Sequence, residues 1–167
     1  VAGNLTDHYD PRNKVLRLSD ATYSSTSVAA MGVAAHECGH AIQHATGYAP
    51  LKFRSSLVPV ANFGSQIAWP LIILGLMFSS NMSSVFLTAG ILAFSMAVLF
   101  QLATLPVEFD ASNRAIRILA GSGMLHEEEV RHTRKVLSAA ALTYVASAAS
   151  AILQLLRIVM LANRRRD

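Results

Sequence analysis

The sequence predicts a mainly α-helical, polytopic membrane protein that begins with a small β-hairpin. The chain of 167 residues is 53% apolar and only 14% charged, about half the charged share of an ordinary soluble domain. The shortage is local, because residues 55–107 contain no Asp, Glu, Lys, Arg or His. One helix needs roughly 20 apolar residues to cross a membrane, so this stretch is long enough for two crossings.

The first 54 residues carry turn and helix-capping signals instead. Residues 10–13 (DPRN) put Asp first and Pro second, as in a type I turn, and a short apolar run follows at 15–18. We therefore expect a β-hairpin here. Hydroxyl residues at 24–27 can cap a helix start, and Gly47 can end one. The sequence predicts a single helix from about Ser27 to Thr46.

Three apolar segments follow. Leu57–Phe78 and Ser84–Leu105 each have the length of a membrane span and are joined by the uncharged turn SSNMSS. Pro106 suits the first turn of the next helix, which we expect to end at Gly121 or Gly123. The third segment, Ala139–Ala162, is rich in Ala and Ser, which lets helices approach closely in lipid.

Charge and cysteine content narrow the class of protein. The net charge is +4, and basic residues beside apolar spans indicate contact with anionic lipid and retention on the cytoplasmic side. If the third segment crosses the membrane fully, the basic tail NRRRD lies on the other side of the membrane from the remaining basic residues. The tail then argues against a cytoplasmic location for those residues. Nucleic-acid binding would require a basic face rich in aromatic residues, and the sequence contains no such pattern, so we expect no nucleic-acid partner. The single Cys38 excludes an internal disulfide framework, and the start at Val1 without a signal peptide suggests a missing N-terminal portion.

The stretch VAAHECGHAIQH contains the motif H-E-x-x-H. His36 and His40 are four residues apart, so on a helix both imidazoles lie on one face and can share a metal ion. Glu37 is offset from them, beside the metal and not on it, where it can take a proton from metal-bound water. The alternative is that the histidines are satisfied core residues. We expect one Zn²⁺ per chain.

A two-histidine site needs a third protein ligand. Two membrane crossings return the chain to the side of the motif, which brings Glu108 near it. The acidic residues Glu127–Glu129 precede basic ones and suit a solvated helix start, so Glu108 is the better candidate. Asp110 can pair with Arg114 four residues later. His44 is eight residues from His36, a rise of about 12 Å, so it is a helix-surface or cleft residue and not the third ligand.

Four stretches, NLTDHYDPRNKVLRLS, VAAHECGHAIQH, LKFRSSLVPVANFGSQIAW and LPVEFDASNRA, resemble the YugP-type family of membrane zinc metallopeptidases. The resemblance implies a zincin-like helix, zinc on His36, His40 and Glu108, and Glu37 as catalytic glutamate. Gluzincins and HtpX-like proteases usually carry Asp four residues after the liganding Glu, where it orients a histidine. Ser112 stands at that position here, with Asn113 or Asp110 as possible substitutes.

We therefore expect a membrane-bound zinc-dependent endopeptidase that hydrolyses peptide bonds in protein or peptide substrates, including membrane proteins. The alternative is a zinc-binding membrane protein with a regulatory or scaffolding role and no catalysis. We expect a multi-pass protein of a bacterial cell membrane with its active site on the cytoplasmic side. The candidates for ligand-orienting or substrate contacts are His44, Asp110, Ser112, Asn113 and Arg114. The expected single domain comprises the hairpin and zinc helix (1–54), a transmembrane hairpin (55–105), the third-ligand segment (106–137) and a third apolar helix (138–163).

Overall fold

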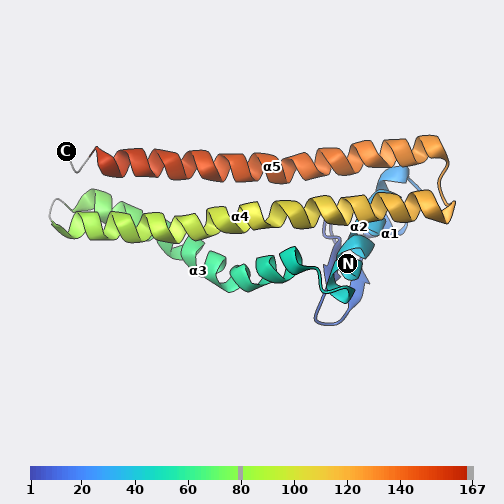
Figure 1. Cartoon of the computed structure of the whole chain (residues 1–167), viewed down its shortest axis with the longest axis horizontal. Helices are drawn as coiled ribbons and strands as arrows, with labels where there is room; N and C mark the ends of the chain where they lie inside the picture. The colour runs from blue at the N-terminus through green and yellow to red at the C-terminus, as the bar shows by residue number, and fades with distance from the viewer. Residues whose placement is uncertain (79–80, 165–167) are drawn as a thin grey trace. The chain divides into compact units, whose positions relative to one another are not determined.

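A computed structural model describes residues 1–78 and 81–164 (Figure 1). Ser79 and Ser80 of the expected uncharged turn, and residues 165–167 of the basic tail, lie outside the described residues. The chain forms two compact units. The first contains Val1–Lys52 and Leu105–Thr143, and the second contains Phe53–Thr104 and Tyr144–Asp167.

The first unit begins with the predicted β-hairpin, which consists of β1 (His8–Asp10) and β2 (Val15–Arg17) paired antiparallel. The Asp10 carboxylate closes the turn by accepting the N–H groups of Arg12 and Asn13 at 3.0 and 3.2 Å. A hydrogen bond from the side chain of Asn13 helps to lower the pKa of Asp10 to about 2. The turn signal in the sequence thus acts through a charged carboxylate.

The helix predicted to carry the H-E-x-x-H motif is α2 (Val28–Ala45). Ser27 is its N-cap, and the Ser27 hydroxyl accepts the N–H of Ala30 at 3.2 Å. Gly47 follows its C-terminus with φ of +64°, the left-handed conformation that glycine adopts without a Cβ penalty. The short helix α1 (Asp20–Tyr23), which Ser19 caps, was not predicted from the sequence.

The first unit also contains one part of each of two long helices. These are α4 (Asn81–Ser122) from Leu105 onward and α5 (Glu127–Asn163) as far as Thr143. A buried apolar cluster joins α2, α4 and α5, and its members are Ala35, Ala115, Ile116, Leu119 and Leu137. The cluster fixes α2, and hence the motif, against the C-terminal part of α4.

The expectation that a new helix starts at Pro106 is wrong. Pro106 lies inside α4, which runs without a break from Asn81 to Ser122. Proline lacks the N–H that would bond to the carbonyl one turn earlier, and in a soluble helix this usually causes a kink or break. Apolar helices that pack against neighbours tolerate it, and α3 (Ala49–Met77) contains Pro59 and Pro70 in the same way.

In the second unit, α3 and the first part of α4 pack as antiparallel neighbours through glycines. A Cβ on Gly64 would stand 2.6 Å from the carbonyl oxygen of Ala93, and one on Gly75 would stand 2.7 Å from Leu87 Cγ. Such close contact is typical of helix pairs in lipid. The buried cluster of this unit is Ile72, Leu87, Ile158 and Ala162.

Three of the described helices are long and apolar enough to cross a membrane: Ala49–Met77, Met82–Ser122 and Glu127–Asn163. Only 17% to 28% of the residues in their most apolar windows are buried. Their remaining apolar surface is suited to contact with lipid, because exposed apolar surface of this extent is rare on soluble proteins. The predicted fold class, a polytopic helical protein with a small N-terminal β-hairpin, is confirmed.

Candidate metal centre

Helices α2 and α4 touch at Gly39 of the motif. A Cβ on Gly39 would lie only 2.5 Å from the carbonyl oxygen of Ala111, so only glycine allows this approach. Glu108 lies one turn before Ala111 and Ser112 lies directly after it. Both side chains therefore reach the histidines of α2.

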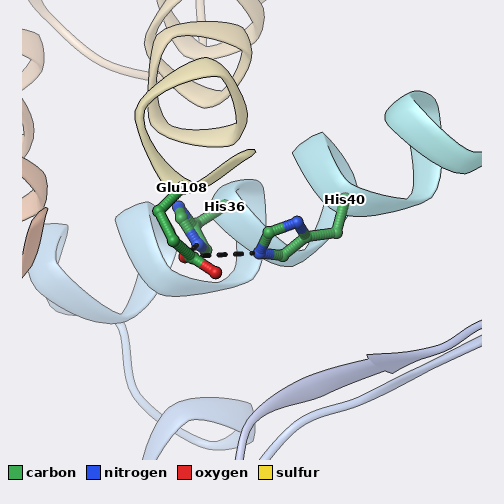
Figure 2. A group of neighbouring side chains, drawn as sticks. All are labelled: His36, His40 and Glu108. Atoms are coloured by element: carbon green, nitrogen blue, oxygen red, sulfur yellow. Dashed lines mark hydrogen bonds and ion pairs between the residues drawn. The ribbon is translucent and has the colours of Figure 1, made fainter. Parts of the chain in front are cut away.

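The side chains of His36, His40 and Glu108 converge, the histidines from α2 and the carboxylate from α4 (Figure 2). Glu108 Oε2 lies 3.2 Å from Nε2 of His36 and 3.6 Å from Nε2 of His40. One ligand atom from each of the three lies within 4.8 Å of the others. Glu108 is 3% exposed, so it is a buried carboxylate with two imidazoles as neighbours.

The donor set and its spacing fit a zinc ion. Two His nitrogens and one carboxylate oxygen are ligands that zinc takes in catalytic sites. Two ligand atoms that each lie about 2.1 Å from a tetrahedral ion are about 3.4 Å apart. The observed separations of 3.2 and 3.6 Å lie on either side of that value.

Both imidazoles also have a partner on the nitrogen that faces away from Glu108. His36 Nδ1 is hydrogen-bonded to Ser112 Oγ at 3.1 Å, and His40 Nδ1 is hydrogen-bonded to Gln43 Oε1 at 3.0 Å. Metal-binding histidines are usually oriented by a partner on the second nitrogen. Burial alone would lower the pKa of His40, but the hydrogen bond and charge of Glu108 outweigh it, so the pKa is raised.

Ser112, which stands where related proteases usually carry an Asp, orients His36 in this structure. Ser112 is 7% exposed and bonds directly to His36, so the shorter side chain still reaches the imidazole. Among the described hydrogen bonds, none joins the side chain of Asn113 to either histidine. Asn113 and Ser112 both line a cavity of about 250 Å³ between α4 and α5, which is otherwise mainly apolar.

Gln43 is the site residue that the sequence analysis missed. Its side chain is fully buried, and its Nε2 donates to the carbonyl oxygen of Val107 and to Asp110 Oδ2, both at 2.8 Å. Asp110 also pairs with Arg114 at 2.6 Å, as the four-residue spacing predicted. The only available signal for Gln43 was its position one helical turn after His40.

Glu37 of the motif is held by the N-terminal hairpin. The residue is 8% exposed, and its Oε2 accepts the backbone N–H of Tyr9 in β1 at 2.8 Å. The hydroxyl of Tyr9 is hydrogen-bonded to Nδ1 of His44 at 2.8 Å. His44 is exposed and is not part of the His36–His40–Glu108 group. The hairpin thus lies directly beside the motif.

Cys38 and the acidic residues at the start of α5 lie outside the metal-binding group formed by the described residues. Burial, and then the charge of Glu37, raise the pKa of the Cys38 thiol. Glu127, Glu128 and Glu129 form the first turn of α5, which agrees with their prediction as a solvated helix start. Glu128 pairs with Arg131 at the surface.

Comparison with known proteins agrees with this geometry. Residues 1–163 match the model of a family described as "putative neutral zinc metallopeptidase". The chain is 49% identical over 167 residues to "Putative membrane protease YugP" of Bacillus subtilis (strain 168), a match that covers 100% of this chain and 73% of that relative. No solved structure matches the chain. The resemblance predicted from the sequence is confirmed, and the chain belongs to the family described as putative neutral zinc metallopeptidases.

Proposed function

We propose that this chain is a membrane-bound, zinc-dependent endopeptidase. The observation that carries the proposal is the convergence of His36 Nε2 and His40 Nε2 on the buried Glu108, together with a Glu37 carboxylate whose charge acts on His40. A site that only stabilised the fold would not need a carboxylate at the position of Glu37. The family description and the name of the Bacillus relative support the same activity.

His36, His40 and Glu108 would hold the zinc ion, which leaves a coordination position for water or substrate. A bound zinc ion polarises the scissile carbonyl and lowers the pKa of water. Ser112 and Gln43 hold the two imidazoles in the orientation that turns both Nε2 atoms toward Glu108. The ligands are therefore oriented by the fold before any metal binds.

Glu37 is the proposed acid–base residue. It accepts a proton from the attacking water and returns it to the amine nitrogen that leaves when the peptide bond breaks. The N–H of Tyr9 holds one carboxylate oxygen. Among the described contacts no partner holds the other oxygen, which is therefore available for proton transfer.

The three apolar helices and the name of the relative support a location in a membrane. We propose a bacterial cell membrane, with the metal centre on the cytoplasmic side and with proteins or peptides, including membrane proteins, as substrates. Basic residues on one side of a membrane favour the cytoplasm. Many of the basic residues belong to the unit that contains the metal centre: Arg12, Lys14, Arg17, Lys52, Arg114, Arg117, Arg131, Arg134 and Lys135.

The proposal is tested with the purified chain in detergent. We expect about one zinc ion per chain by metal analysis and cleavage of a denatured, fluorescently labelled casein. A chelator should stop the cleavage, and added zinc should restore it. Zinc binding without cleavage of this or any membrane-protein substrate would favour the regulatory alternative, and absence of metal would overturn the zinc site itself.

A further inference from the structure

We propose that Gln43 is a positioning residue that sets the tautomer of His40 and so presents the Nε2 lone pair to the metal. The inference rests on the proposed zinc site. It concerns a residue three positions after the motif, whose side chain is fully buried between α2 and α4. Gln43 does not touch Glu108 in any described hydrogen bond, so its action passes through His40.

The contacts of the Gln43 amide define its orientation. The carbonyl oxygen of Val107 and the carboxylate of Asp110 lie 2.8 Å from one end of the amide. Both atoms can only accept hydrogen bonds when the carboxylate is charged, so that end must be the NH₂ group. The other end, which faces His40, must then be the oxygen. A flipped amide would set its oxygen against two acceptors.

The orientation of Gln43 in turn defines the proton on His40. An amide oxygen only accepts, so His40 Nδ1, at 3.0 Å from Gln43 Oε1, must carry a hydrogen. A neutral imidazole has a single N–H, which leaves Nε2 with its lone pair. Nε2 faces the Glu108 carboxylate at 3.6 Å, so Glu108 can hold a second proton on this nitrogen in the charged ring, and the lone pair is free in the neutral ring. The buried glutamine therefore selects the tautomer that can bind a metal.

His36 has no equivalent device. Its Nδ1 is bonded to the hydroxyl of Ser112, and a hydroxyl both donates and accepts. Ser112 can therefore satisfy either tautomer of His36, whereas Gln43 accepts only one tautomer of His40. The two histidines of the motif differ in this respect although their ligand atoms have similar surroundings.

The NH₂ group of Gln43 has two acceptors, the carbonyl oxygen of Val107 and the carboxylate of Asp110. Loss of one acceptor should therefore matter less than loss of the Gln43 amide itself. Loss of the Asp110 side chain leaves the carbonyl of Val107 to hold the NH₂ group. Loss of the amide leaves His40 Nδ1 with no acceptor. We therefore expect a smaller effect from Asp110→Ala than from Gln43→Met, which has nearly the same length and no hydrogen-bonding amide.

The first measurement is the nitrogen NMR spectrum of metal-free, unmodified protein at a pH that keeps His40 neutral, with His40→Gln used to assign the signal. We expect His40 as the Nδ1–H tautomer. Finding the Nε2–H tautomer in the unmodified protein would overturn the inference, whether or not any variant folds.

The second measurement compares zinc affinity by chelator competition. Gln43→Met is expected to show a mixture of His40 tautomers and an affinity reduced about 10- to 100-fold, the usual effect of losing a ligand's orienting partner. Thr133→Val is the matched control, because Thr133 is also fully buried in the same unit and contacts Gly32 away from the histidines. It should leave tautomer and affinity unchanged.

The outcomes separate this inference from the proposed function. Unmodified protein that binds zinc, together with a Gln43→Met variant of equal affinity and unchanged tautomer, contradicts the role of Gln43 alone. Unmodified protein that shows the Nδ1–H tautomer but binds no zinc contradicts the zinc site alone.

Discussion

Gly39 of α2 lies against the backbone of Ala111 of α4, so close that a Cβ on Gly39 would stand 2.5 Å from the Ala111 carbonyl oxygen. A backbone oxygen cannot turn aside as a flexible side chain can. The two helices would have to separate to admit a methyl group, and Glu108 and Ser112 would move away from the histidines with α4. This contact therefore limits how closely the three candidate ligands can approach one another.

We expect Gly39→Ala to lower the free energy of unfolding by about 1–3 kcal/mol, as overpacking does, and to weaken zinc binding by at least about tenfold. Chelator competition and thermal melting measure the two effects. Gly121→Ala is the matched control, because a Cβ at Gly121 in α4 meets nothing within 4 Å. Alanine is the better helix former by about 1 kcal/mol, so that variant should be as stable as the parent or more so. Equal zinc affinity in both variants would contradict the importance of the contact.

Glu108→Gln is expected to lose both the metal and the cleavage activity. The substitution keeps the size of the side chain but removes the charge that lies 3.2 and 3.6 Å from the two Nε2 atoms, and losing a ligand should cost more than the roughly 100-fold effect of losing an orienting partner. Metal analysis after gel filtration measures the loss. The control is Glu128→Gln on the exposed first turn of α5, which should retain zinc and activity. Stoichiometric zinc in the Glu108 variant would contradict its role as a ligand.

Glu37→Gln is expected to keep zinc and to reduce the cleavage rate by about 10²- to 10⁴-fold, the usual contribution of a general acid–base residue. Glutamine retains an oxygen that can accept the N–H of Tyr9, so the hairpin should stay in position and the melting temperature should change little. Steady-state cleavage and metal content are measured on the same preparation. A fully active variant would rule out Glu37 as the proton carrier, whereas loss of zinc would indicate a structural role.

Acid is expected to weaken the turn of the N-terminal hairpin. The hydrogen bonds from the side chain and backbone of Asn13 favour the charged form of Asp10 and lower its pKa from 3.8 to about 2. Because the folded-state pKa is depressed, the stabilisation is complete above the unfolded value near 3.8 and is lost as the pH falls through about 2. A carbon NMR titration of the Asp10 carboxyl should give a midpoint near 2.

Hydrogen exchange of the Arg12 and Asn13 amides, which donate to the Asp10 carboxylate, reports the same loss of the turn. Asp10→Asn keeps an acceptor oxygen for the turn but cannot titrate. The part of the pH dependence of turn stability between pH 4 and 2 that comes from residue 10 should therefore disappear in this variant. An Asp10 midpoint near 3.8 in the unmodified protein would show that these hydrogen bonds do not favour the charged form.

The sequence by itself determined the features that depend on spacing along the chain. The absence of charge from 55 to 107 predicted apolar helices, the DPRN turn predicted the hairpin, and the four-residue spacing of His36 and His40 predicted a shared helix face. Each of these follows from the local geometry of a helix, a turn or a membrane span. The start of a helix at Pro106 was also inferred from local rules, and it was wrong because α4 packs well enough to continue through a proline.

The two membrane crossings and the family resemblance already pointed to Glu108, but the tertiary structure alone decided how closely it approaches the motif and which other distant groups join it. Glu108 and Ser112 reach His36 because Gly39 lets α2 touch the backbone of α4, and Tyr9 reaches Glu37 because the hairpin packs against α2. The orientation of Gln43 depends on a carbonyl and a carboxylate more than 60 residues away in the chain. Contacts of this kind depend on the distance between packed backbones, and spacing along one helix carries no information about that distance.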